Sequence, residues 1–171
     1  SYRTNGDSWR SYKDYSGGGM TDWGAHHFGG ATFAVDVREL QPEEVTYHNE
    51  KGKEHLTFRY SNGILIHHNR PGRGNLDVKG TPGEKKEPKP IPKYGGGESN
   101  IFGDFIHCVK TRETPFRDIQ YAVNTMSVCH LGIVAYELKR SLKWDVAGQR
   151  FIDDPEADRF LDRARREPWV L

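Results

Sequence analysis

Asp22 and His26 are the residues whose types and spacing most directly suggest chemistry, and they lie in the stretch YSGGGMTDWGAHHF of residues 15–28. Because they are four positions apart, a helix would place both side chains on one face, close enough to interact. A carboxylate in that position orients an imidazole and stabilises its charged form. Such a histidine is suited to moving a proton on or off a substrate hydroxyl. The adjacent His27 would point about a quarter-turn away and cannot share that role equally.

The same residues allow two other interpretations. From composition alone, the simpler one makes Asp22 a helix N-cap and His26 a partly buried, hydrogen-bonded side chain. A metal site is the other, in which Asp22 and His26 would be joined by one histidine of the pair His67-His68. Consecutive strand residues point to opposite faces, so only one of that pair could contribute. Gly17–Gly19 are a weak phosphate-binding signal, since no strand is expected before them and no GK[ST] follows.

The elements that must position these residues begin with a turn at Gly17–Gly19, which residues with a side chain would resist. Thr21 or Asp22 is a good N-cap for a helix through the histidines, and Gly29-Gly30 are expected to interrupt or end it. The segment 31–40 is ambiguous, because its apolar residues alternate as in a strand while its length and composition also permit a helix.

An antiparallel β region is expected next, because three segments are rich in β-branched and aromatic residues. Asn62-Gly63 joins two of them and is a strong hairpin signal. A fourth strand, LDVKGT, is possible after the third. The segments are EEVTYHN, HLTFRYS and ILIHHN.

The C-terminal part is expected to be helical. Apolar residues at Phe102, Phe105, Ile106 and Val109 follow the spacing of one helix face. Asp118 is the expected cap of a long helix, and Asp154 the cap of a last one with Pro155 at its first position. In the long helix, His130 is expected to be structural and to lie beside an apolar stripe made by Ile119, Ala122, Val123, Met126, Cys129 and Ile133.

This order of elements predicts an α+β fold with an open, mostly antiparallel sheet and helices packed on one face. The length of 171 residues fits a single domain over 1–171, with 82–99 as a loop rich in Pro, Lys and Gly. Cys108 and Cys129 are expected to be buried free thiols. The net charge of +1 gives no sign of nucleic-acid or membrane-surface binding, and no apolar run approaches the ~20 residues of a membrane span. No signal-peptide core is visible, and the compartment is left open.

The chain resembles the C-terminal domain of the glucose-fructose oxidoreductase / inositol dehydrogenase / MocA (Gfo/Idh/MocA) family, and more closely its bacterial branch. The resemblance extends over nearly the whole chain and favours a helix around residues 31–35. It implies half of an NAD(P)-dependent oxidoreductase that acts on a sugar, polyol or related hydroxy compound. The segments that carry it are WRSYKDYSGGGMTDWGAHHF, GDFIHCVKTRETPFRD, SVCHLGIVAYELKRSLKWD and EADRFLDRARREPWVL.

The resemblance also implies roles for particular residues. Asp22 and His26 match an Asp–His pair that, in such proteins, works with a lysine of the Rossmann half. Trp9, Arg10 and His27 are the implied substrate contacts. The chain departs from the family in three respects. It has no GxGxxG motif after a strand and no Glu-Lys-Pro segment of the cofactor domain, and Gly29 stands where many relatives carry an Asp.

The resulting expectation is a substrate-binding and assembly domain that is inactive by itself. NAD or NADP would belong to the nucleotide-binding domain of a two-domain parent, with no cofactor on this chain. The other expected partners are a carbohydrate or polyol substrate and further copies of the chain, associated through the sheet. The alternatives are a stand-alone, non-catalytic sugar-binding or oligomerisation domain, and hydrolytic or lyase chemistry at Asp22 and His26. Substrate identity, NAD against NADP and oligomer size are left open.

Overall fold

A computed structural model describes residues 9, 12, 13, 15–69, 76–79, 101–162, 167 and 168, and of 76–79 it describes the backbone. The expected loop at 82–99 lies outside the described residues, as does Arg10.

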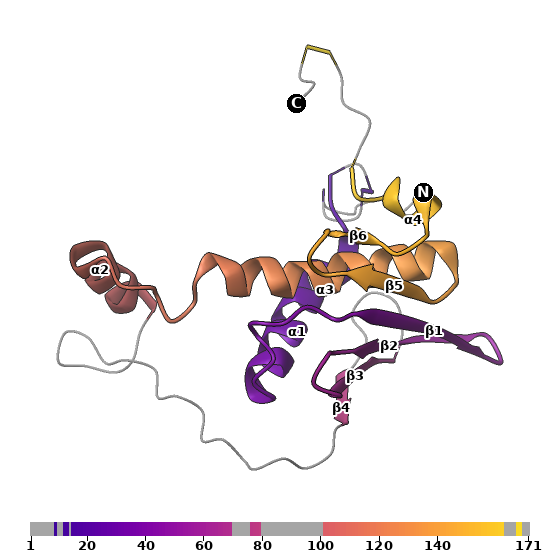
Figure 1. Cartoon of the computed structure of the whole chain (residues 1–171), viewed down its shortest axis with the longest axis horizontal. Coiled ribbons are helices and arrows are strands. Elements are labelled where there is room, and N and C mark those ends of the chain that lie inside the picture. Colours follow the sequence, from indigo (N-terminus) through magenta and orange to yellow (C-terminus); the bar gives the residue numbers. More distant parts are fainter. Residues whose placement is uncertain are drawn as a thin grey trace.

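Six strands form one sheet in the order β4-β3-β2-β1-β5-β6 (Figure 1), and every neighbouring pair is antiparallel. The α+β class and the open antiparallel sheet are therefore confirmed. The expected hairpin is confirmed as well: Gly63 has the left-handed φ of 83° that its turn requires, and its N–H donates to Tyr60 O at 2.9 Å. The strands are β1 (Glu44–Glu50), β2 (Lys53–Arg59), β3 (Leu65–His68), β4 (Leu76–Lys79), β5 (Leu142–Asp145) and β6 (Arg150–Phe151).

Helices α1 and α3 pack against the sheet, whereas α2 lies apart from it near the N-terminal end of α3 (Figure 1). The face of β1–β3 that meets α1 and α3 is buried and carries Val45, Leu56, Phe58, Ile66 and His68. The helical elements are the 3₁₀ turn η2 (Gly18–Met20), α1 (Trp23–Ala34), α2 (Ile101–Thr111), α3 (Ile119–Leu138) and α4 (Pro155–Asp158).

Helix α1 continues through Gly29-Gly30, so the expected interruption there is wrong. Contacts from outside the glycine pair hold the helix together. Tyr121 Oη donates a 2.5 Å hydrogen bond to Gly29 O, and Thr32 Oγ1 donates to Phe28 O at 2.8 Å. The same continuation to Ala34 settles the ambiguous segment in favour of a helix at its start.

Helix α3 begins as expected, with Asp118 Oδ1 accepting from Tyr121 N–H at 2.8 Å. Its buried stripe differs from the expected one, because Ile119 and Val123 are exposed while Asn124 is buried. Asn124 can occupy a core position because its amide donates to Arg38 O at 3.0 Å and its carbonyl accepts from Gln41 Nε2 at 3.1 Å. The periodicity of apolar residues therefore misplaced the buried face.

The described residues after α3 are less helical than expected. Strands β5 and β6 follow α3 directly, and α4 is a single turn. Trp144 of β5 is buried and donates from Nε1 to Gln41 Oε1 at 2.9 Å. The cap at Asp154 and the proline at the first helical position are confirmed.

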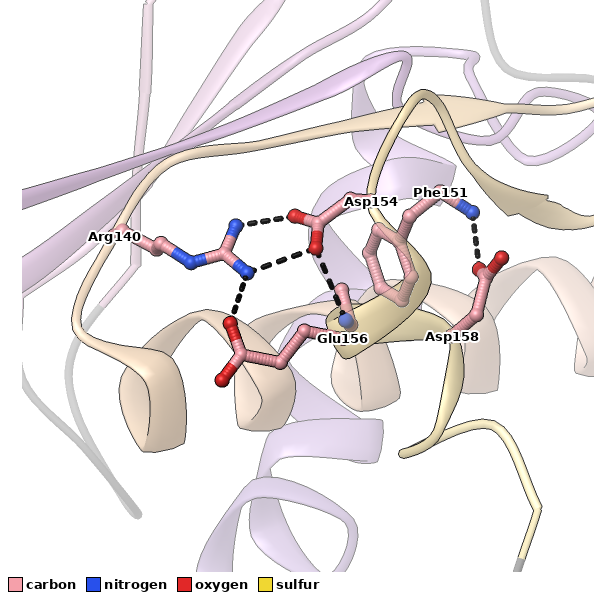
Figure 2. A network of polar contacts seen from close by, with 6 residues as sticks. Arg140, Phe151, Asp154, Glu156 and Asp158 are labelled. Atoms are coloured by element: carbon pink, nitrogen blue, oxygen red, sulfur yellow. Dashed lines mark hydrogen bonds and ion pairs between the residues drawn. The ribbon is translucent and has the colours of Figure 1, made fainter.

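Arg140, just after α3, fastens this last segment (Figure 2). Its guanidinium binds both carboxylate oxygens of Asp154, and Nη2 also contacts Glu156 Oε2 at 3.0 Å. Asp158 Oδ1 accepts from Phe151 N–H at 2.7 Å, which ties α4 to β6. Together these contacts hold β6 and α4 beside the end of α3.

Candidate functional site

The glycine run forms the approach to α1. Gly18 has a left-handed φ of 66°, and its N–H donates to Ser16 Oγ at 3.1 Å. The η2 turn follows, and Thr21 Oγ1 donates back to Gly18 O at 3.3 Å. A side chain at Gly17 would collide with Thr21 and with Ile133 Cδ1. The glycines thus serve a tight turn that delivers the chain to the first residue of α1.

Asp22 occupies the N-cap position of α1, but its side chain makes no hydrogen bond to the N–H groups of the first turn. Its carboxylate therefore does not act as the conventional helix cap, which was the simplest interpretation of this residue. Asp22 is half-buried, and His26 follows it one helical turn later with an exposed side chain.

Trp23 lies between the two adjacent histidines. Its ring centroid is 5.8 Å from that of His26 and 6.2 Å from that of His27, and both pairs are tilted. His27 is half-buried, whereas the rings of Trp23 and His26 are exposed. His26 is therefore the histidine of this pair that is available to a molecule arriving from solvent.

Two adjoining hollows open beside α3, and one of them also borders α1. The His26 hollow, of about 520 Å³, lies between α1 and the first turns of α3 and is lined by His26, Phe33, Arg117, Asp118, Tyr121 and Met126, among others. The Asp22 hollow, of about 460 Å³, lies beside the glycine turn and is lined by Trp9, Tyr15, Thr21, Asp22, Met126 and His130, among others.

Met126 lines both hollows, so Asp22 and His26 open on neighbouring spaces. Trp9 lies in the Asp22 hollow with its ring exposed, which brings this implied substrate contact to the site. His27 is not among the described residues that line either hollow. The structure thus groups Asp22, His26 and Trp9 around one methionine and leaves His27 to the side.

The wall of the His26 hollow opposite α1 is held in place by hydrogen bonds. Tyr121 Oη donates a hydrogen bond to Gly29 O, and Tyr121 N–H donates one to Asp118 Oδ1. A Cβ at Gly29 would meet Tyr121 Oη at 3.5 Å, which is an ordinary contact. Gly29 and Tyr121 therefore lie close together and both line the His26 hollow.

His130 is a residue that sequence reasoning underrated. It was expected to be structural, but its side chain is exposed and lines the Asp22 hollow. It follows Met126 by four residues on α3 and so projects from the same face of the helix. The four-residue spacing between Met126 and His130 is visible in the sequence, but it points to the site only when Met126 is known to face it.

His67 and His68 point to opposite faces of the sheet, as the strand geometry required. His68 is buried, with Nδ1 2.8 Å from Tyr136 Oη, and His67 Nδ1 is 2.9 Å from Thr57 Oγ1 on the other face. Neither lines the two hollows. Among the residues that the structure describes, no group of three or more His, Cys, Asp or Glu side chains is placed to hold a metal ion.

Two further sequence expectations can be compared with the described part of the chain. Cys108 and Cys129 are both buried free thiols, as predicted, and burial raises the pKa of Cys129 to about 12. None of the described helices is long and apolar enough to cross a membrane.

Comparison with known protein families gave a match to the C-terminal part of the chain. The model of an oxidoreductase family, described as its C-terminal alpha/beta domain, matches residues 89–171, just under half of the chain. A search of curated proteins and a search of solved structures each returned no match. The matched part includes α3, which supplies one wall of both hollows, while α1 with Asp22 and His26 precedes it.

Proposed function

Residues 89–171 belong to the C-terminal domain of the Gfo/Idh/MocA oxidoreductase family, and from this premise we propose that the chain is the substrate-binding and assembly half of an NAD(P)-dependent oxidoreductase. Its substrate would be a sugar, a polyol or a related hydroxy compound. The observation that carries the proposal is the exposed imidazole of His26 in a hollow walled by the matched helix α3, one helical turn from Asp22.

His26 has the position required of a proton-transfer group. Oxidation of an alcohol to a ketone removes the hydroxyl proton, and a ring nitrogen of His26 can accept it from a substrate held in the hollow. In the reverse direction the same nitrogen returns the proton. Asp22 lies on the neighbouring hollow, where its carboxylate can accept a hydrogen bond from a second hydroxyl of the substrate.

Trp9 and His130 complete the proposed binding surface beside Asp22. An exposed indole offers a flat apolar face for the C–H groups of a sugar ring, and a carboxylate and an imidazole offer hydrogen-bond partners for hydroxyls. Ligand sites commonly combine apolar walls with a few convergent polar groups in this way.

The described residues do not form a dinucleotide cradle. Such a cradle needs a strand that leads through a glycine-rich turn into a helix, whereas the sequence predicts no strand before Gly17–Gly19. We therefore assign NAD(P), on which the family generally depends, to a separate nucleotide-binding domain. Hydride transfer belongs to that domain, and for this chain we derive the proton step alone.

Assembly through the sheet is the second part of the proposal. Across β1–β3, the face turned away from the helices carries Thr46, His48, His55, Thr57 and His67, which are all partly exposed. The rings of His48 and His55 stack at 4.4 Å, and His48 Nε2 is 3.1 Å from Thr57 Oγ1. No described helix packs on this ordered polar face, which supports its use by a second copy.

The test follows the imidazole resonances of this chain by NMR while myo-inositol and a panel of hexoses are added. A ligand that binds in the His26 hollow should shift the His26 ring signals, and His26→Gln should weaken its binding by about tenfold or more. His55→Gln, on the sheet face, is the matched control and should bind as the wild type does. A panel in which no compound perturbs His26 would refute the assignment.

A titration with NADH and NADPH tests the assignment of the cofactor to another domain. Energy transfer from the tryptophans to the bound nicotinamide should be absent. Saturable binding at micromolar concentrations would contradict the assignment and would require a nucleotide site on this chain.

A stand-alone, non-catalytic sugar-binding domain is the alternative function. The observation that favours it is the separation of Asp22 and His26 onto two hollows, since a binding site has no need of a coupled acid–base pair. Under this alternative, sugars would bind in the Asp22 hollow, and their affinity would be unchanged by His26→Gln but reduced by Trp9→Ala.

A further inference from the structure

Helix α2 exposes most of its apolar side chains. Phe102 is 77% exposed and Phe105 is 60% exposed, and Ile106 and Val109 are about half exposed. These four residues, here called the α2 stripe, lie at i, i+3, i+4 and i+7 and therefore share one face of the helix. Single exposed apolar residues are ordinary, but a contiguous stripe of this kind marks a surface that is normally covered.

The buried side of α2 carries a carboxylate and a thiol, those of Asp104 and Cys108, whereas its large apolar side chains are exposed. Asp104 Oδ2 accepts from Phe116 N–H at 2.8 Å, which ties the helix to the segment before α3. The hydrophobic side of α2 is left for another partner.

The position of α2 leaves that side accessible. Figure 1 shows α2 beyond the N-terminal end of α3, away from the sheet and from α1. The start of α3 adds two more exposed apolar side chains at this end of the molecule, Ile119 at 78% exposure and Val123. Exposed apolar side chains therefore occur both on α2 and on the first turns of α3.

We infer that this surface is an interface between two copies of the chain, in which the α2 stripe of one copy packs against the α2 stripe of the other about a two-fold axis. A stripe at i, i+3, i+4 and i+7 is self-complementary when two helices pack side by side, because each presents the same narrow seam. A projecting helix can also meet its symmetry mate without a clash between the two sheets.

The size of the surface agrees with a dimer contact. A phenylalanine can bury about 150–250 Å², so the exposed parts of Phe102 and Phe105 with the neighbouring aliphatic side chains offer roughly 500 Å² per copy. A standard interface buries about 800 Å² per partner, of which somewhat more than half is apolar. The apolar share of such an interface is therefore present on this end of the molecule.

The inference is independent of the proposed enzymatic role and differs from assembly through the polar sheet face. Sedimentation velocity of the chain over a range of micromolar concentrations tests it. We expect a dimer whose dissociation constant rises by about 30-fold or more in Phe102→Asp and in Phe105→Asp, because central aromatic anchors carry most of an interface's binding energy. Ile152→Asp, a matched change at an exposed apolar residue after β6, should leave the dimer intact.

Both α2 variants should keep the far-UV circular dichroism of the wild type, because the replaced side chains are exposed. A wild-type chain that is monomeric throughout the range overturns the inference. Self-association of unchanged strength in Phe105→Asp also overturns it, whereas a residual dimer that is lost in Thr57→Arg is the assembly through the sheet face. Loss of the dimer in Ile152→Asp as well would show that the effect is not specific to α2, and would likewise overturn it.

Discussion

The ion pair between Arg140 and Asp154 allows a quantitative test of what holds the end of the chain in place. The carboxylate of Asp154 accepts hydrogen bonds from both terminal nitrogens of the Arg140 guanidinium (Figure 2). Asp154 Oδ1 also accepts from Ala157 N–H at 3.1 Å and so caps α4. Its side chain is 16% exposed, against 38% for Arg140. One carboxylate thus serves both as a helix cap and as the anchor of the α3 terminus.

The contact with Arg140, followed by the Ala157 N–H, lowers the pKa of Asp154 from 3.8 to about 2. A depressed carboxyl pKa stabilises the folded state above the unfolded-state pKa, and that stabilisation is lost as the pH falls through the folded-state pKa. A folded-state pKa that is lower by almost two corresponds to a stabilisation of ~2.4 kcal/mol. Solvent screening of the partly exposed Arg140 reduces this stabilisation to about 1–2 kcal/mol. About half of it should remain at pH 3.

The substitution that isolates this contribution is Asp154→Asn, because asparagine retains an oxygen that can cap α4 but carries no charge. At pH 7 the free energy of unfolding should fall by about 1–2 kcal/mol. The difference between variant and wild type should shrink between pH 4 and pH 2 as Asp154 of the wild type becomes protonated. Urea unfolding followed by tryptophan fluorescence measures it, since buried Trp144 packs against Phe151 next to the pair.

Asp153→Asn is the matched control. Asp153 is the preceding residue, exposed and in the left-handed region with φ 53°, which asparagine tolerates well. It should leave the free energy of unfolding within about 0.5 kcal/mol of the wild type. The reasoning is refuted if Asp154→Asn is as stable as the wild type at pH 7, or if the difference between them does not shrink on acidification.

Two substitutions test the core. Gly132→Ala should lower the free energy of unfolding by about 1–3 kcal/mol, because the new Cβ would lie 3.1 Å from Phe58 Cζ and 3.3 Å from Leu56 Cδ1. Gly30→Ala is the control, and it should stabilise the chain because a Cβ there points into open space on α1. Equal stability of the two variants in urea would contradict this packing. Tyr60→Phe should leave the free energy of unfolding unchanged or raise it by up to ~1 kcal/mol, since the buried Tyr60 hydroxyl has no hydrogen-bond partner among the described residues. A loss above ~1 kcal/mol in a urea melt would reveal a partner that the structure does not show.

Local chemistry made part of the fold predictable from sequence. Asn62-Gly63 marks a tight hairpin turn, and the strands on either side pair as expected. Asp118 and Asp154 each cap a helix because a carboxylate satisfies N–H groups that have no partner inside the helix. These signals depend on a few neighbouring residues, so they survive without knowledge of the tertiary structure.

Features that depend on distant contacts were missed. Strands β5 and β6 are short and follow a long helix, and β5 exists because it pairs with β1. The buried position of Asn124 depends on Gln41, which lies far away in sequence. In both cases the local structure depends on a tertiary contact, which the neighbouring residues in the sequence do not predict.

The sequence indicated Asp22 and His26 as candidate site residues but not the shape around them. Helix α1 begins at Trp23, so Asp22 lies at the N-cap position and only His26 is within the helix. The division into two hollows at Met126 could not be anticipated, because it depends on how α3 crosses α1. The exposure of His130 was missed for the same reason.

The strand order has a consequence for how the chain folds. Strands β1 to β4 are joined in sequence and can pair as soon as they are synthesised, but β5 joins β1 at Glu44–Lys143, about a hundred residues later. Closing so long a loop costs chain entropy before any contact repays it, so this pairing is expected to form late. Until β5 arrives, one edge of β1 presents unpaired N–H and C=O groups that can recruit other chains. Helix α3 must therefore dock before the sheet is closed, and slow docking would favour aggregation over completion of the fold.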